Sequence, residues 1–303
     1  MERYSDEQER IAQALEASDH YRVLRRLVPR PVINPPDGTP TRIGLFVDVE
    51  TTGLESSTDE VIELAMVPFT FGMDGRIFEI GRPLEQKAEP SQPIPLNVQQ
   101  LTGLTAGELS GKVIDLFEVD RYTKAADLIV AHHARFDRPF LENLSPAFQQ
   151  RPWACSMSQI NWCELGYEST KLEYLALKTG YFFTGHRAVW DCFAGIELLA
   201  SRVGDSNGMC RLLKNALKTS WRIGVTGSPF AANAALRDRG YKWVQRRWEV
   251  EVDEASKAAE LLFLKSERFG NASVIVDRVS PFERFSDRRT LHGPKGAHSV
   301  SAG

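Results

Sequence analysis

Long apolar runs and paired cysteines are both missing from this sequence of 303 residues. No window approaches the 18 uninterrupted apolar residues that a membrane-spanning helix needs, so we expect no membrane partner. The first ten residues, MERYSDEQER, are polar and acidic, which excludes the apolar segment of a secretory signal. The cysteines show no CxxC spacing and are expected to be reduced, mostly buried thiols of a cytoplasmic protein. They are Cys155, Cys163, Cys192 and Cys210.

Charge is distributed unevenly along the chain, although the net charge is only −3. Residues 1–200 contain 19 Lys and Arg against 29 Asp and Glu, whereas residues 201–303 contain 18 against 11. An acidic part joined to a basic part suggests two tasks, and the basic part is a candidate for binding a polyanion. The alternative is uneven surface charge without a partner.

The hydrophobic pattern predicts that the first part of the chain is an α/β domain. Residues 1–28 have helical spacing, and the proline-rich connector 29–40 follows, so residues 1–40 are expected to form a helical segment and a linker to a domain over 41–202. Strands are expected over 43–49, 60–70, 76–82 and 127–132, and helices from about 134, over 171–180 and over 187–200. Hairpin strands followed by alternating strands and helices indicate a mixed sheet that is covered by helices.

A second, smaller unit is predicted over residues 221–285, after a segment at 203–220 that is expected to be a linker or an extra helix. Its segments read as strand, helix, two strands, helix and strand, which is the order of a small two-layer α+β domain. Residues 286–303 have no apolar period and are expected to be a disordered tail.

Acidic residues stand where the predicted strands end or helices begin. Asp48 and Glu50 alternate at the carboxyl end of the first buried strand, so both side chains should point to one face. Asp137 and Asp191 lie near the starts of two helices. Each carboxylate alone is most simply a solvated surface group, but close carboxylates repel unless a cation lies between them. Four oxygen donors without a cysteine favour Mg²⁺ or Mn²⁺.

Three segments, VDVETTGL, AHHARFDRPFL and GHRAVWD, resemble the three motifs of the DEDDh 3′→5′ exonucleases, a family that includes the proofreading subunit of bacterial DNA polymerase III. The resemblance covers about residues 42–202 and implies an RNase H-like mixed sheet flanked by helices, followed here by the small α+β unit. One DxE pair is a weak signal, but three motifs in the family's order are a strong one. The second unit is similar to an accessory domain that follows the nuclease in some bacterial exonucleases.

The resemblance also implies a role for each site residue. Asp48 would bridge two metal ions, Glu50 and Asp191 would bind the ion that activates water, and Asp137 would support the second ion. His186 would be the general base, because a histidine can accept a proton from water near neutral pH. Two divalent ions about 3.5–4 Å apart can stabilise both the attacking and the leaving oxygen of a phosphodiester displacement.

Substrate contacts are expected beside these motifs. Thr51, Thr52 and Leu54 would line the terminal nucleotide, unless they only form the turn after the first strand. His133 occupies the position where the second motif usually has asparagine, so local support of the substrate could differ there. His132 is expected to be a structural hydrogen-bonding residue.

A predicted hairpin of the second unit combines aromatic and basic side chains. Such a surface could stack bases and contact phosphates of a single strand, or the tryptophans could belong to the core. The residues are Tyr241, Lys242, Trp243, Arg246, Arg247 and Trp248.

The sequence thus predicts a metal-dependent 3′→5′ exonuclease that releases nucleoside 5′-monophosphates from DNA, with RNA as the other substrate class. A DNA polymerase or a replication or repair complex is a further expected partner. The alternative is a non-catalytic nucleic-acid-binding or polymerase-associated scaffold subunit, which would not need a carboxylate cluster.

Overall fold

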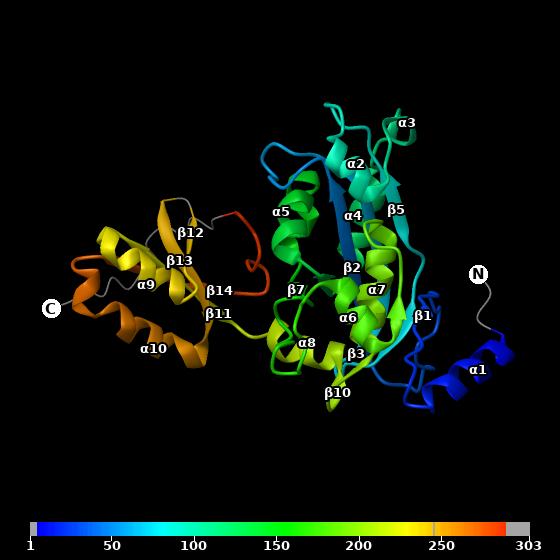
Figure 1. The fold of residues 1–303 in the computed structure, drawn as a ribbon. Coiled ribbons are helices and arrows are strands. Elements are labelled where there is room, and N and C mark those ends of the chain that lie inside the picture. Colours follow the sequence, from blue (N-terminus) through cyan, green and yellow to red (C-terminus); the bar gives the residue numbers. More distant parts are fainter. Residues whose placement is uncertain (1–4, 245, 289–303) are drawn as a thin grey trace. The chain divides into compact units, whose positions relative to one another are not determined.

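The computed structural model describes residues 5–244 and 246–288 (Figure 1). Two compact units are present: one contains residues up to 216 and again 285–287, and the other contains residues 217–284 and 288. Among the described residues, no helix is both long and apolar enough to cross a bilayer. The predicted tail falls mainly on residues 289–303, which lie outside the described residues.

The first unit is built on a mixed six-stranded sheet. Its strand order is β4-β3-β2-β6-β7, and β5 pairs with β3 beside β4. The central strand β2 is antiparallel to β3 and parallel to β6. The strands are β2 (Thr41–Thr51), β3 (Val61–Gly72), β4 (Ile77–Ile80), β5 (Leu84–Lys87), β6 (Leu128–Ala131) and β7 (Trp153–Cys155).

Helices cover both faces of this sheet (Figure 1). Side chains of alternate β2 residues enter two different apolar cores: Phe46 joins the core beneath α7, and Leu45 and Val47 join the core beneath α5. Gly195 lets α7 approach closely, since a Cβ there would lie 2.1 Å from the Phe46 ring. The helices are α2 (Leu96–Thr102), α3 (Ala106–Leu109), α4 (Leu116–Ala125), α5 (Ala134–Leu144), α6 (Leu172–Thr179), α7 (Ala188–Ala200) and α8 (Gly208–Ala216).

The amino-terminal segment differs from its prediction. Helix α1 spans only Asp6–Glu16, and residues 25–26 form the short strand β1 (Arg25–Arg26), which pairs with β8 (Tyr181–Phe182). This pairing buries Leu27 in the core of the first unit, so Leu27 packs on the domain rather than lying on one side of a helix. Residues 5–40 therefore belong to the first unit.

The segment 203–220 contains the extra helix that the sequence leaves open, rather than a linker. Residues 202–207 form a small hairpin of β9 (Arg202–Val203) and β10 (Ser206–Asn207), and α8 follows it. Met209 and Leu212 of α8 are buried in the core beneath α7. The first unit therefore continues to residue 216.

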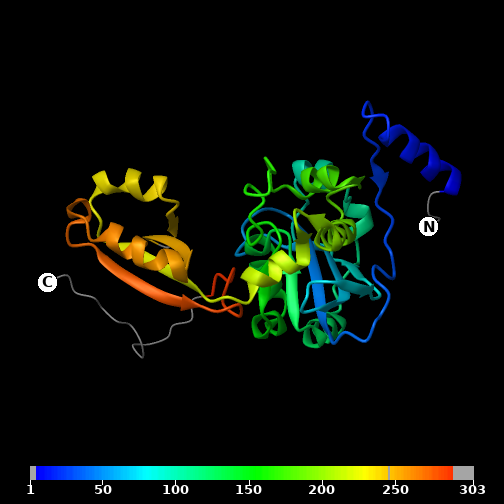
Figure 2. The ribbon, with the colours of Figure 1, turned by 90° about the horizontal axis from the view of Figure 1, so that it is seen from below.

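The second unit is a four-stranded antiparallel sheet with the strand order β12-β13-β11-β14. This spatial order of the strands is that of the split β-α-β fold, and the order of strands and helices along the chain agrees with the prediction from the sequence. One sheet face and the two helices enclose a single apolar core that includes Ile223 and Trp248 (Figure 2). The elements are β11 (Ser220–Thr226), α9 (Asn233–Asp238), β12 (Lys242–Val244), β13 (Arg247–Asp253), α10 (Glu254–Leu264) and β14 (Ser273–Val279). Short 3₁₀ turns span Pro146–Gln150, Phe230–Ala232 and Glu267–Phe269.

Candidate active site

Three carboxylates meet where β2 ends and α7 begins. Asp48 and Glu50 lie on the β2 face that carries Phe46, which is the face covered by α7. Asp191 lies in the first turn of α7, where it accepts a hydrogen bond from the Arg187 backbone N–H at 3.1 Å. Oxygen atoms from the three side chains all lie within 4.8 Å of one another. The structure therefore brings Asp191 to the pair Asp48 and Glu50, which lies far from it in the sequence.

Burial and mutual repulsion make this cluster unfavourable in its fully ionised form. Burial, followed by the charges of Asp191 and Asp137, raises the pKa of Asp48 well above its usual range. Burial, followed by the charges of Asp191 and Glu63, raises the pKa of Glu50 to about 8, and burial raises the pKa of Asp191 to about 7. A bound cation would remove this penalty, because it favours the charged carboxylates. A purely oxygen donor set suits a hard divalent cation such as Mg²⁺ or Mn²⁺.

Asp137 lies beside the cluster but outside the group of three. It occupies the first turn of α5, which begins after β6, and its side chain is buried. Because β2 and β6 are parallel, their carboxyl ends share one edge of the sheet, and this brings α5 to the site. Burial raises the pKa of Asp137 to about 7, and the charge of Asp191 contributes. Asp137 thus lies close enough to the cluster for its charge to raise the pKa of Asp48.

His186 lies on an exposed corner immediately before α7. Its backbone has φ of +60°, a conformation that residues other than glycine rarely adopt. The preceding Gly185 allows Glu173 to approach, because a Cβ at that position would lie 2.5 Å from a Glu173 oxygen. His186 is therefore an exposed residue on a backbone corner at the start of the helix that carries Asp191.

The predicted substrate residues fall into two groups. The hydroxyls of Thr51 and Thr52 are used within the turn after β2, where they donate to the Gly53 carbonyl and to Asp59 respectively. The turn-forming interpretation therefore accounts for both threonines. Leu54 is 80% exposed, and the exposed His133 stacks on Phe136 with ring centroids 6.1 Å apart. Leu54 and His133 thus both lie at the protein surface.

His132 has the structural role that the sequence predicts. Its two ring nitrogens lie 2.9 Å from the Ser156 hydroxyl and 2.7 Å from the Thr170 carbonyl. Burial lowers its pKa to about 4, so the ring is neutral. It therefore fixes the segment between β7 and α6 to the end of β6.

The hairpin of the second unit offers only part of the predicted nucleic-acid surface. Tyr241 and Trp248 are buried in the core, and the Trp248 indole donates to Asn233 at 3.0 Å. Arg247 is paired with Glu249. Apolar burial and ion pairing thus use three of the six side chains, and the alternative that the tryptophans belong to the core holds for Trp248 but not for Trp243. The exposed members are Lys242, Trp243 and Arg246.

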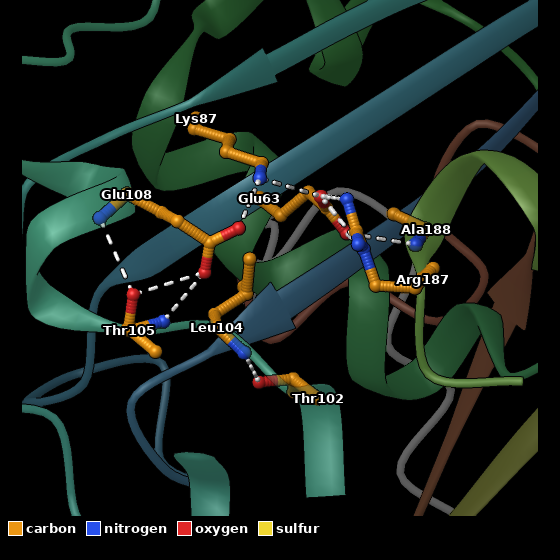
Figure 3. A network of polar contacts seen from close by, with 8 residues as sticks. All are labelled: Glu63, Lys87, Thr102, Leu104, Thr105, Glu108, Arg187 and Ala188. Carbon is orange, nitrogen blue, oxygen red and sulfur yellow. Dashed lines mark hydrogen bonds and ion pairs between the residues drawn. The ribbon is translucent and has the colours of Figure 1, made fainter.

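The sequence motifs did not identify two residues that lie beside the carboxylate cluster. The first is Glu63 on β3, which is 1% exposed. The second is Arg187, the residue after His186, whose guanidinium donates to Glu63 at 3.1 Å (Figure 3). A carboxylate inside the apolar strand VIELAMVPF is a usable signal, because a buried charge needs a partner.

The fold and the carboxylate cluster define an α/β protein with an acidic site at the carboxyl end of its central strand. Residues 45–199 match the exonuclease family RNase_T, and the chain belongs to this family. This confirms the resemblance that the three motifs indicate.

Relatives of known name match the same region. The chain is 32% identical over 168 residues to the PolC-type DNA polymerase III of Bacillus subtilis (strain 168), covering 52% of this chain and 11% of that protein. It is 29% identical over 178 residues to the DNA polymerase III subunit epsilon of Treponema pallidum (strain Nichols), covering 54% of this chain and 79% of that protein. The chain thus spans only about a tenth of the length of the PolC relative.

Solved structures with similar chains include two nucleases. Exonuclease I has a TM-score of 0.48 and 18% identity, with 80% of this chain and 63% of that chain covered. Exonuclease X in complex with 5′ overhanging duplex DNA has a TM-score of 0.40 and 20% identity, with 55% and 99% covered.

Proposed function

We propose that the chain is a metal-dependent 3′→5′ exonuclease that hydrolyses DNA, in preference to RNA, to nucleoside 5′-monophosphates. The observation that carries the proposal is the half-buried cluster of Asp48, Glu50 and Asp191 within an exonuclease-family fold. The names of the relatives, both DNA polymerase III proteins, support DNA as the substrate and a polymerase as a partner.

The residues present fit a pair of divalent cations. Asp48, Glu50 and Asp191 would hold one ion, with Asp48 shared, and Asp137 would support the second. When bound, the ions would polarise the scissile phosphate, favour the hydroxide form of a bound water and stabilise the leaving oxygen.

The chain's own groups would then orient and deprotonate the attacking water. His186, on its exposed corner, would accept the proton of that water. Leu54 and His133 would contact the terminal nucleotide from the exposed rim. The raised pKa values of the carboxylates mean that metal binding must release protons, so affinity for metal should increase with pH.

Digestion of end-labelled nucleic acids tests this function. We expect 5′-labelled single-stranded DNA to shorten stepwise with Mg²⁺ or Mn²⁺, with 5′-mononucleotides as products and no reaction in EDTA. The rates of digestion of duplex DNA and of RNA with the same sequence show which substrate the enzyme prefers. Binding without cleavage in both metals would contradict the proposal and favour a non-catalytic scaffold. Cleavage from a 5′ end would contradict the direction.

A further inference from the structure

Glu63 is a buried carboxylate beside the metal-site candidates, and it has its own set of partners. It lies directly opposite Glu50 in the register of β2 and β3, so both side chains point to the α7 face of the sheet. Its oxygens do not belong to the group of three carboxylates. Both of them instead bind donors from the start of α7 and from β5.

The start of α7 depends on this carboxylate. One Glu63 oxygen accepts the backbone N–H of Ala188 at 3.0 Å, and the other lies 3.1 Å from the Arg187 guanidinium (Figure 3). The residue that precedes α7, Arg187, provides no side-chain cap of its own. The first backbone N–H groups of a helix have no acceptor within the helix, and here Glu63 on strand β3 provides the acceptor for one of them.

A second cation links this carboxylate to the protein surface. Lys87 on β5 lies 3.9 Å from Glu63 and 3.8 Å from Glu108, and Figure 3 shows its amino group between the two. Glu108 also accepts from the backbone and hydroxyl of Thr105. Two cations and a backbone amide thus hold Glu63 on the α7 side of the sheet.

We propose that Glu63 is a positioning residue that fixes the corner His186–Ala188 and thereby sets the orientation of His186 and Asp191. Three observations join at this corner: the positive φ of His186, the two Glu63 contacts to the next two residues, and the hydrogen bond from Arg187 N–H to Asp191. A strained backbone conformation persists only where the surrounding contacts determine it. Glu63 supplies these contacts from the rigid sheet, while Asp191 supplies one from within the helix.

This inference rests on the proposed exonuclease function for its kinetic consequence, but the corner itself can be measured without activity. In Glu63→Ala, we expect amide exchange of residues 186–190 to accelerate about tenfold or more, because the acceptor of Ala188 N–H is gone. Amides of β2 and β3 should keep their protection. Hydrogen-exchange mass spectrometry on the full chain makes this comparison.

Kinetics give the second measurement. Residues that orient a metal ligand or a base typically account for about 10–100-fold in activity, so kcat of Glu63→Ala should fall by that factor while KM changes less than about threefold. Glu63→Gln keeps an acceptor of the same length for Ala188 but loses the charge opposite Arg187, so its kcat should fall less. Arg187→Met should resemble Glu63→Gln, and the double variant should lose no more than either single one.

Glu85→Gln is the matched control, because this exposed carboxylate on β5 undergoes the same change of charge in the same neighbourhood. It should leave both exchange and kcat unchanged. Unchanged exchange at 186–190 in folded Glu63→Ala and Glu63→Gln would overturn the inference, as would additive losses in the double variant. If the wild-type chain cleaves no nucleic acid, the proposed function fails, and the exchange data alone then decide the role of Glu63.

Discussion

Glu50 and Glu63 face each other across the β2–β3 ladder, yet they have opposite electrostatic surroundings. Burial and the charges of Asp191 and Glu63 raise the pKa of Glu50 to about 8. Glu63 has Arg187, Lys87 and a backbone N–H as partners. No described residue forms an ion pair with Glu50, whereas Arg187 and Lys87 both pair with Glu63. This difference separates a ligand candidate from a structural carboxylate.

Asp48→Ala should abolish cleavage and should also raise the melting temperature of the metal-free protein. The side chain is shared by both proposed ions, so its loss should cost about 10³-fold or more in kcat. Its removal also relieves repulsion with Asp191 and Asp137. Rate assays in Mg²⁺ and thermal unfolding in EDTA measure the two effects. Asp277→Ala, on exposed β14, serves as the control, and near-normal turnover of Asp48→Ala would refute the assignment.

The metal-free protein should lose stability as pH rises from about 5 to 8. The folded pKa values are about 8 for Glu50 and about 7 for Asp137 and Asp191, above the unfolded values of about 4. The folded state therefore holds more protons than the unfolded state in this window, and the unfolding free energy falls by about 1.4 kcal/mol per pH unit for each excess proton.

Excess Mn²⁺ should oppose this loss, since it replaces the protons. The rise in melting temperature on adding Mn²⁺ should thus be larger at pH 8 than at pH 5.5. Thermal scans across this range with EDTA or Mn²⁺ provide the test. A metal-free melting temperature that is flat or rising over pH 5–8 would show that these carboxyl groups are not buried as a cluster.

His186→Ala should lower kcat by roughly 10²–10⁴-fold, the usual contribution of a general base. Binding of Mn²⁺ should change little, because His186 is assigned no metal contact. Isothermal titration calorimetry measures Mn²⁺ binding, and single-turnover cleavage measures the rate of the chemical step. His20→Ala, far from the motifs in the sequence, is a matched control. Loss of a bound ion in His186→Ala would instead identify this residue as a ligand.

Local sequence patterns predicted the central part of the first unit well. Apolar runs of four or more residues located β2, β3 and β6, and the motif order placed Asp48, Glu50 and Asp191 in one site. Strands of two or three residues, such as β1 and β7, are too short to show a period and form only because a neighbouring strand is present.

Long-range contacts explain the remaining differences. Leu27 has helical spacing with its neighbours, but pairing of β1 with β8 buries it in the sheet core. Glu63 looks like one polar residue in a strand, and its partner Arg187 lies 124 positions away. Such pairs depend on the assembled sheet, so local periodicity cannot reveal them.

The two tryptophans of the second unit should respond differently to substitution. Trp248→Ala removes a buried side chain and should cost about 3–5 kcal/mol of stability in that unit. Trp243 is 59% exposed, so Trp243→Ala should cost much less. If this surface binds single strands, Trp243→Ala should weaken binding without changing its salt dependence, because stacking releases no counterions. Chemical denaturation and titrations of a long oligonucleotide at several salt concentrations make the comparison. Equal stability losses would contradict the assigned burial.

Residues 285–287 should stabilise the first unit, although they follow the second unit in the sequence. The Ser286 hydroxyl donates to Glu142 at 2.6 Å, and Glu142 forms a buried ion pair with Arg138 at 2.7 Å on α5, next to Asp137. Hydrogen bonds to charged groups contribute about 1.5–3 kcal/mol, so Ser286→Ala should lower the unfolding free energy by about that amount.

Truncation after Ser220 should have a larger effect than Ser286→Ala, because it also removes Phe285, which packs on the core beneath α5. All five proposed catalytic residues are retained in the truncated chain, so Mn²⁺ binding should survive at temperatures where the chain is folded. Ser266→Ala is the matched control: its hydroxyl is buried and has no hydrogen-bond partner within the described part of the chain, so its loss should cost little. The test compares the melting temperatures of the full-length protein, Ser286→Ala, the truncated chain and Ser266→Ala. A truncated chain that melts with the first unit of the full-length protein would show that residues 285–287 contribute nothing to the helix that carries Asp137.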